Sequence, residues 1–471
     1  DMLRAVFSRD QRSSILPADY WPLPSSVTHV SAGRDAAAAA PGLVGDDGQD
    51  DGTGADAASG HVTNPLLVYR RAILRAVPFV VPFMDRHALW VHGSPEPVMF
   101  GAWGLQVRRG HELVDALPLL TSRDFLADMR AKQAQGLRPF LSVTFLSESG
   151  AAEPGVDGGG LFKEWLLLVL QRAVESGYFV ATESQSLWVN RDWASLGPRK
   201  ATLDIYRCLG MVVGWALASS ILIEFPLALP FRSRILGQST CFDDLHAVDP
   251  EVYRSLAWLR SCPPDEVAEL DLTFAVGAQS EVPLRPGGAS IPVTAENRSE
   301  YVFLAAHYHL VTAIRAPAAA FMRGLEYFVR RDRLAMFGAN DLQRLMSGVP
   351  GKLDVADWRT NTVYGPGFHP EHPTIRAFWE VVDELDEEQQ RRLLRFATSC
   401  SRPPLTGFGG LRPLFRINVQ RPEVPEDEGD DILPSSSTCV NLLRLRPYRH
   451  KHVLKERVEY AINAGSGFEL S

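Results

Sequence analysis

Residues 433–441 read Leu-Pro-Ser-Ser-Ser-Thr-Cys-Val-Asn and place Cys439 in a short, polar, turn-prone segment. The alternating apolar residues at 440–445 predict that this segment runs into a β-strand. A cysteine at such a junction should be accessible to a macromolecular partner, whereas Cys208 lies in a long apolar stretch. Because an accessible thiolate is a good nucleophile, Cys439 is the first candidate for a catalytic residue.

The sequence around this segment predicts a compact α/β lobe of roughly 100 residues. Its expected elements are a helix capped by Thr374, a helix opened by a capping box of Asp386 and Gln389, strands at 414–419 and 440–445 around an acidic loop at 421–431, and a last helix at 454–464. The turn-rich sequence before this lobe predicts a hinge at 364–368, formed by Tyr364, Gly365 and Gly367.

The part of the chain before the hinge is predicted to be mostly helical. Its expected elements are a helical face within 64–77, an amphipathic stretch over 110–129, a strand at 141–145, a helix from Leu161, a buried helix over 203–223, a small mixed region at 239–300, a helical region at 299–332 and a helix at 340–348. Residues 31–61 are mostly Ala, Gly and Asp, so we expect a disordered linker there.

Composition narrows the class of protein. The length of 471 residues suggests about three lobes, and 45% hydrophobic with 22% charged residues is ordinary for a globular chain. A formal net charge of −8 disfavours a protein held by phosphate groups, so nucleic acid is not an expected partner. The five cysteines are odd in number and include no CxxC pair, which disfavours zinc ribbons and secretion.

A soluble, intracellular chain is expected for two further reasons. The longest uncharged apolar stretch, 208–223, is shorter than the roughly 20 residues needed to span a bilayer. The first residues lack the apolar core of a signal peptide, and the abrupt start is typical of a cut fragment.

Three other features have simple structural interpretations. Gly158–Gly160 is not followed by the Lys-Ser/Thr of a phosphate-binding loop and predicts a crowded turn before a helix. We expect Asp157 and Glu164 to make capping and structural hydrogen bonds rather than to act in catalysis. Three histidine pairs have no further ligands at metal-binding spacing, so no metal and no cofactor is predicted; they are His307 and His309, His369 and His372, and His450 and His452.

The segment around Cys439 resembles the active-site loop of the HECT-type ubiquitin-protein ligases. Further motifs resemble those of the same family in the same order: an acidic, Gly-rich motif at 153–165, a "VT-x-EN" segment at 293–302, the approach to the hinge at 358–364, Phe378-Trp379 in the first terminal-lobe helix, 395–398 with Gly407-Phe408, and Phe468 fourth from the end. They lie within 105–471, about three quarters of the chain.

This resemblance implies an α+β, bilobed HECT fold. A large, mostly α-helical lobe at 105–363 would be hinged at 364–368 to a smaller α/β catalytic lobe at 369–471, and a conjugating-enzyme-binding subdomain would occupy about 240–330. Residues 1–63 would form an N-terminal extension that contains the linker, and 64–104 a helical extension. A cytoplasmic location is expected, with the nucleus as a second compartment.

The resemblance also implies a ubiquitin-protein ligase. Cys439 would accept ubiquitin from a ubiquitin-conjugating enzyme as a thioester and pass it to a lysine of a protein substrate. Thr438, Phe468 and Glu469 would support this chemistry, with Glu469 or the chain-terminal carboxylate accepting the proton of the attacking amine. Tyr301 matches a position that contacts the conjugating enzyme, although it could instead pack inside its own helix pair.

Some residues depart from the family pattern. Ser437 stands where the family often has histidine, and Val440 replaces a common phenylalanine. Two other functions are considered. A thiol hydrolase acting on ubiquitin conjugates would need a histidine to activate Cys439, and a catalytically inactive HECT-like scaffold would have no need for the intact Thr438-Cys439 pair.

Overall fold

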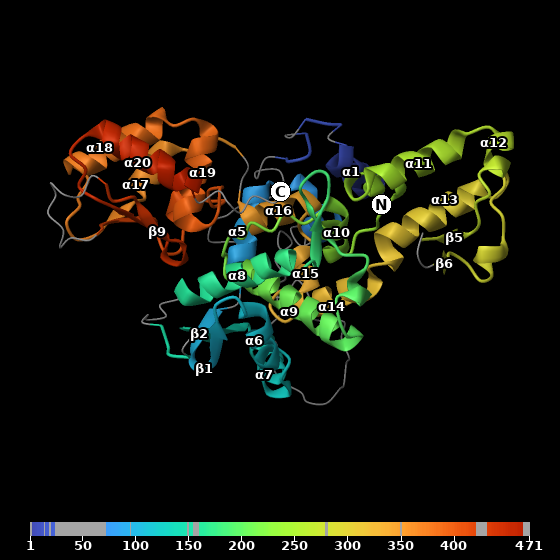
Figure 1. Ribbon diagram of the computed structural model, residues 1–471, viewed down its shortest axis with the longest axis horizontal. Helices are drawn as coiled ribbons and strands as arrows, with labels where there is room; N and C mark the ends of the chain where they lie inside the picture. Colours follow the sequence, from blue (N-terminus) through green and yellow to red (C-terminus); the bar gives the residue numbers. More distant parts are fainter. Residues whose placement is uncertain are drawn as a thin grey trace, which may run out of the picture. The chain divides into compact units, whose positions relative to one another are not determined.

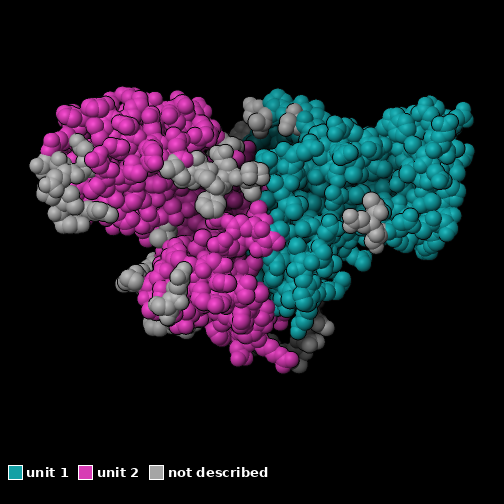
Figure 2. Space-filling model, viewed as in Figure 1, with its two compact units in different colours: residues 1–94, 177–210, 227–342 teal, residues 95–176, 211–226, 343–471 magenta. Residues whose placement is uncertain are grey.

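The computed structural model describes residues 2–13, 15–17, 20–23, 72–94, 96–147, 150–153, 160–277, 281–348, 351–420 and 431–464. The predicted linker at 31–61, residues 421–430 of the acidic loop, Asp157, Phe468 and Glu469 lie outside these ranges, and Cys439 is described through its backbone. The chain forms two compact units (Figure 1 and Figure 2). Unit 1 comprises residues 1–94, 177–210 and 227–342, and unit 2 comprises residues 95–176, 211–226 and 343–471.

Unit 1 consists mainly of helices (Figure 1). Its helices are α1 (Met2–Ser13), η1 (Pro78–Val80), α5 (Phe83–His92), η2 (Trp193–Ser195), α9 (Arg199–Ala218, which continues into unit 2), α10 (Leu229–Ile235), η3 (Phe242–Ala247), α11 (Pro250–Ser261), α12 (Pro264–Glu269), η4 (Gly288–Ser290), α13 (Arg298–His307), η5 (Tyr308–Thr312), α14 (Arg315–Leu325), α15 (Arg331–Leu334) and α16 (Ala339–Ser347, which also continues into unit 2). Two antiparallel strand pairs complete it: β3 (Phe179–Ala181) with β4 (Leu187–Val189), and β5 (Ala275–Val276) with β6 (Val282–Pro283).

The core of unit 1 is aromatic around β3, α10 and α14. The rings of Phe179, Phe231 and Phe321 meet edge to face, with centroids 5.3–6.0 Å apart, a geometry that aromatic quadrupoles favour. At the N-terminal end of the chain, Arg12 of α1 forms an ion pair with Asp244 at 2.6 Å. Helix α1 is therefore docked on the body of unit 1.

Unit 2 combines a two-stranded parallel sheet with an α/β lobe. Its first elements are β1 (Glu96–Arg108), α6 (Glu112–Leu120), α7 (Arg123–Ala134), β2 (Leu137–Leu146) and α8 (Gly160–Glu175). The later elements are α17 (Val355–Thr360), β7 (Val363–Tyr364), α18 (Pro373–Glu384), α19 (Glu387–Thr398), η6 (Phe408–Gly410), β8 (Arg416–Val419), β9 (Ser435–Ser437), η8 (Thr438–Val440), β10 (Leu442–Leu445) and α20 (Lys451–Ala464).

The later elements surround one sheet with the strand order β7-β8-β10-β9. Strands β7, β8 and β10 are parallel, and β9 pairs antiparallel with β10. The core on this sheet contains Trp358, whose ring stacks on Phe408 with centroids 5.0 Å apart. We call this cluster of buried residues, which begins at Leu353 and ends at Ile462, the terminal core.

Several predicted elements are confirmed. Helices α8, α16 and α20 lie where expected. The capping box is present, since Asp386 accepts from the backbone N–H of Gln389 at 2.8 Å and the Gln389 side chain accepts from the Asp386 N–H at 3.0 Å. The structure contains small sheets and separate helices, as the α+β class predicts.

Other predicted boundaries are wrong for identifiable reasons. The stretch 110–129 forms two helices, because Ser122 caps α7 by accepting from the Phe125 N–H. Helix α9 ends at Ala218 rather than near residue 223. Helix α18 is capped by His372, and Thr374 is buried inside the helix. The extension at 64–104 is helical only in part, since β1 begins at Glu96.

Helix α9 has the length and hydropathy of a membrane span. It is the one helix in the described part of the chain that does, with a mean hydropathy of 1.2, and 78% of its apolar window is buried inside the structure. Such burial is typical of a core helix in a globular protein, as the sequence predicted.

Candidate active site

Cys439 lies in the turn between β9 and β10. Ser437 pairs with Leu442 across the hairpin, and the connecting residues 438–440 form the 3₁₀ turn η8. The turn ends at Asn441, whose backbone has a φ of 51° in the left-handed region. Asparagine tolerates this conformation better than most residues, which explains why the strand begins at Leu442 rather than at Val440.

Asn441 fixes the turn to the neighbouring strand. Its side chain is 1% exposed, and its Nδ2 donates to the Pro413 carbonyl at 2.6 Å. Its own carbonyl accepts from the N–H of Arg416, the first residue of β8, at 2.9 Å. Within the turn, the Asn441 N–H donates to the Thr438 carbonyl at 3.3 Å. The backbone at Cys439 is therefore held from both sides.

A lysine of α8 also contacts this turn. The Lys163 Nζ donates to Asn441 Oδ1 at 2.7 Å, to the Thr438 carbonyl at 3.1 Å and to the Thr398 carbonyl at 3.2 Å. Lys163 is 7% exposed. Sequence reasoning missed this role, because Lys163, next to Glu164 at the start of a largely apolar helix, gives no signal of a contact so distant in the chain.

The two arginines near Cys439 have different environments. Arg444 Nη1 donates to the Ser437 hydroxyl at 2.8 Å, so it supports the residue that precedes the turn. Arg446 is buried and donates to the Gln420 carbonyl at 2.9 Å.

Cys400 lies near the end of α19, but it is a poor nucleophile. Its Sγ contacts the Ser347 carbonyl at 3.6 Å. Burial, reinforced by the nearby carboxylate of Glu224, raises the pKa of the Cys400 thiol to about 12. At neutral pH such a thiol has almost no reactive thiolate.

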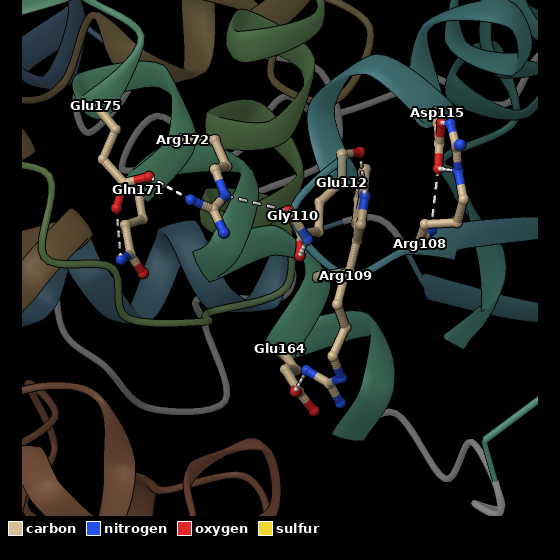
Figure 3. A network of polar contacts seen from close by, with 10 residues as sticks. Arg108, Arg109, Gly110, Glu112, Asp115, Glu164, Gln171, Arg172 and Glu175 are labelled. Atoms are coloured by element: carbon tan, nitrogen blue, oxygen red, sulfur yellow. Dashed lines mark hydrogen bonds and ion pairs between the residues drawn. The ribbon is translucent and has the colours of Figure 1, made fainter. Parts of the chain in front are cut away.

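The acidic residues of the Gly-rich motif make structural ion pairs, and Figure 3 shows the pair of Glu164 with Arg109. Arg109 binds Glu153 at 2.8 Å and Glu164 at 2.9 Å, and its guanidinium lies 4.5 Å from the centroid of the Phe145 ring. Hydrogen bonding to Arg109 lowers the pKa of Glu153. The structural role expected for Glu164 is consistent with these contacts.

Tyr301 lies on α13 in unit 1 and is buried. Its ring meets Phe274 edge to face, with centroids 5.7 Å apart, and burial raises the pKa of its hydroxyl. Two large aromatic residues that the sequence analysis did not single out are exposed in the same unit: Phe303 on α13 at 67% and Trp258 on α11 at 47%. Each lies on its helix away from the positions that are buried, and this break in the helical pattern was the available signal.

The predicted hinge residues are packed against the terminal core. Strand β7, which contains Tyr364, pairs with β8, and the Tyr364 hydroxyl accepts from Trp379 Nε1 at 3.0 Å. A side chain at Gly365 would collide with Asn418, and Phe368 is itself buried in the terminal core. The terminal core begins at Leu353, so the predicted hinge segment lies within the stretch of chain that packs in this core.

The histidine pairs have structural surroundings. His309 lies beside Arg191, and burial together with that cation lowers its pKa to about 4. His450 and His452 stack on each other with centroids 5.4 Å apart. Within the described ranges, no group of three or more His, Cys, Asp or Glu side chains is arranged to hold a metal ion.

Comparison with known proteins gives consistent matches. Residues 167–471 match the family described as HECT-domain (ubiquitin-transferase). The E3 ubiquitin-protein ligase UPL6 of Arabidopsis thaliana is 34% identical over 415 residues, covering 85% of this chain and 39% of the relative. The ubiquitin-protein ligase E3B of Homo sapiens is 30% identical over 441 residues (85% and 40%), and the human E3 ubiquitin-protein ligase HACE1 is 33% identical over 342 residues (71% and 36%). The chain spans about two fifths of the length of these curated relatives.

Proposed function

Because the chain belongs to the HECT-domain family of ubiquitin transferases, we propose that it is the catalytic part of a ubiquitin-protein ligase that carries ubiquitin as a thioester on Cys439. The observation that carries the proposal is the position of Cys439 in a turn between β9 and β10 whose backbone is fixed by Asn441. A fixed turn lets a thiolate approach a large partner without a further ordering cost.

The first step is thiol–thioester exchange. The Cys439 thiolate attacks the carbonyl carbon of ubiquitin on the conjugating enzyme, a new C–S bond forms, the old one breaks, and the enzyme's cysteine leaves as a thiolate. This step depends on close approach of the two sulfur atoms and needs little acid–base assistance.

The second step transfers ubiquitin to a substrate. A neutral lysine amine attacks the thioester carbonyl, a C–N bond forms, the C–S bond breaks, and Cys439 leaves as a thiolate. The amine must lose a proton, and we propose that Glu469 accepts it. Phe468 would dock the end of the chain on the large lobe during this step, and Thr438 would position the turn.

The proposal includes a bilobed arrangement, a conjugating-enzyme site within about 240–330, and a cytoplasmic location with the nucleus as a second compartment. Tyr301, buried against Phe274, would support the conjugating-enzyme site from inside α13. The exposed rings of Phe303 and Trp258 support a protein-binding role for this region, since large exposed aromatic residues are enriched at interfaces.

The proposed function is tested on a non-reducing gel. The chain is incubated with activating enzyme, a panel of conjugating enzymes and labelled ubiquitin. A ubiquitin adduct that reductant removes is expected with at least one conjugating enzyme. A folded chain that gives no adduct with any of them would contradict the proposal. Cleavage of ubiquitin chains would then support a thiol hydrolase, and its absence an inactive scaffold.

Replacing Glu469 with glutamine should slow transfer to free lysine by about tenfold, because solvent can replace only part of the proton acceptor's role. Formation of the thioester should be unchanged. The measurement is single-turnover discharge of preformed thioester at several pH values. Discharge at the rate of the unmodified chain would remove Glu469 from this role.

We propose that the terminal lobe turns about a pivot before Leu353, where the terminal core begins. Stiffening this pivot should slow both transfer steps, because both need the terminal lobe to turn. Insertion of two prolines after Gly351 is expected to reduce both rates by about tenfold without lowering the unfolding temperature, since the space around Gly351 is open. The same insertion after Gly367 tests the hinge predicted at 364–368. If the insertion after Gly367 slows both steps without lowering the unfolding temperature, and the insertion after Gly351 has no effect, the hinge lies at 364–368.

A further inference from the structure

Lys163 connects α8 to two separate segments that lie next to each other in the terminal part of unit 2. One is the end of α19, where its ammonium group binds the Thr398 carbonyl. The other is the turn that contains Cys439, where it binds Thr438 and Asn441. The three acceptors converge on one nitrogen that is almost fully removed from solvent.

The acceptors suit a cation. Thr398 is the last residue of α19, and Ser399 after it is left-handed at φ 62°. Carbonyl groups at the end of a helix carry partial negative charge and favour a positive group. Asn441 Oδ1, the closest acceptor at 2.7 Å, is oriented by the bond from its own Nδ2 to Pro413. Burying an ammonium group costs free energy unless the group is hydrogen-bonded. Breaking any of the three contacts is therefore unfavourable.

The contact acts directly on the peptide group of the candidate nucleophile. The Thr438 carbonyl belongs to the same peptide unit as the Cys439 N–H, and it accepts from both Lys163 and the Asn441 N–H. A positive charge on this carbonyl polarises the peptide and restrains its plane, which restrains the backbone on the N-terminal side of Cys439.

Resting on the proposed function, we propose that Lys163 is a positioning residue for the transfer of ubiquitin from Cys439 to lysine. It holds the turn still against α8 while the amine forms its C–N bond, the C–S bond breaks and the thiolate departs, with the proton of the amine passing to Glu469 or to water. During thioester formation the terminal lobe must meet the conjugating enzyme, and the contact with α8 is released.

The test separates the two half-reactions. In Lys163→Met the side chain reaches as far as the position of Cε but loses the ammonium group and its charge. We expect discharge of preformed thioester to lysine to be at least tenfold slower, and thioester formation to change less than twofold. Lys163→Arg, which keeps the charge, should recover part of the discharge rate. Lys200→Met, at an exposed lysine on α9, is the matched control and should behave like the unmodified chain.

A second variant keeps the proposal testable if Lys163→Met folds poorly. Asn441→Gly removes the closest acceptor, and glycine adopts φ 51° without strain. Discharge should slow in Asn441→Gly, and the double variant should be no slower than the slower single variant, because both remove the same contact.

Three outcomes would overturn the proposal. If both half-reactions slow equally and the unfolding temperature falls, Lys163 supports only the fold. Faster thioester formation with unchanged discharge would show that the contact inhibits thioester formation on Cys439 instead. If the two substitutions slow discharge independently, so that their effects multiply in the double variant, Lys163 and Asn441 act through different contacts. Absence of any Cys439 thioester in the unmodified chain is a different result, because it would contradict the proposed function itself.

Discussion

A chain with Cys439→Ala should form no ubiquitin adduct that reductant removes, and its transfer of ubiquitin to lysine should fall by about a thousandfold or more, as for the loss of other covalent nucleophiles. The reason is that each of the other four cysteines is buried or has a raised thiol pKa. Burial raises the pKa of Cys208 and of Cys400 to about 12. Cys262 is buried, and its thiol contacts the Leu259 carbonyl at 3.6 Å.

Cys241 provides the matched control. It is exposed on unit 1, but partial desolvation and the carboxylate of Asp244 raise its pKa. Cys241→Ser should therefore form the adduct at the normal rate. Cys439→Ser should form ubiquitin adduct slowly, and that adduct should be an oxygen ester that resists reductant and is cleaved by strong base. A reductant-sensitive adduct that survives in Cys439→Ala but disappears in Cys241→Ser would assign the nucleophile to Cys241.

Local signals in the sequence predicted the features that depend on neighbouring residues. The capping box of Asp386 and Gln389 and the end of α20 follow from short-range chemistry, and both were predicted. The turn around Cys439 was also visible, because small residues and a following strand are adjacent in the chain. The start of β10 was placed two residues too early, because apolar alternation does not reveal the left-handed conformation at Asn441.

Contacts between distant segments could not be predicted in this way. Lys163 and Thr438 are 275 positions apart, and nothing in the periodicity of either segment indicates that they meet. The hinge was placed at a Gly-Pro-Gly turn for good local reasons. The same turn is held by β8, because Trp358 and Phe368 enter the terminal core before and after it. Turn chemistry shows where a chain bends, but it does not show which distant residues pack against the bend.

Gly210 on α9 is a position where packing leaves very little space. An ideal Cβ there would lie 1.8 Å from the carbonyl oxygen of Phe321 and 3.0 Å from the backbone nitrogen of Leu325, both on α14 in the same unit. These are backbone atoms, so no side-chain rotation can relieve the collision. The two helices would have to separate, and the edge-to-face contacts of Phe321 with Phe179 and Phe231 would be lost with their present geometry.

We therefore expect Gly210→Ala to destabilise unit 1 by about 3–5 kcal/mol, even though alanine favours a helix over glycine by about 1 kcal/mol. For a unit of this size the unfolding temperature should fall by about 10 °C. Gly104→Ala is the control, because no atom lies within 4 Å of its Cβ position. Thermal unfolding followed by circular dichroism measures both. Equal unfolding temperatures for the two variants would mean that α9 and α14 do not approach each other this closely.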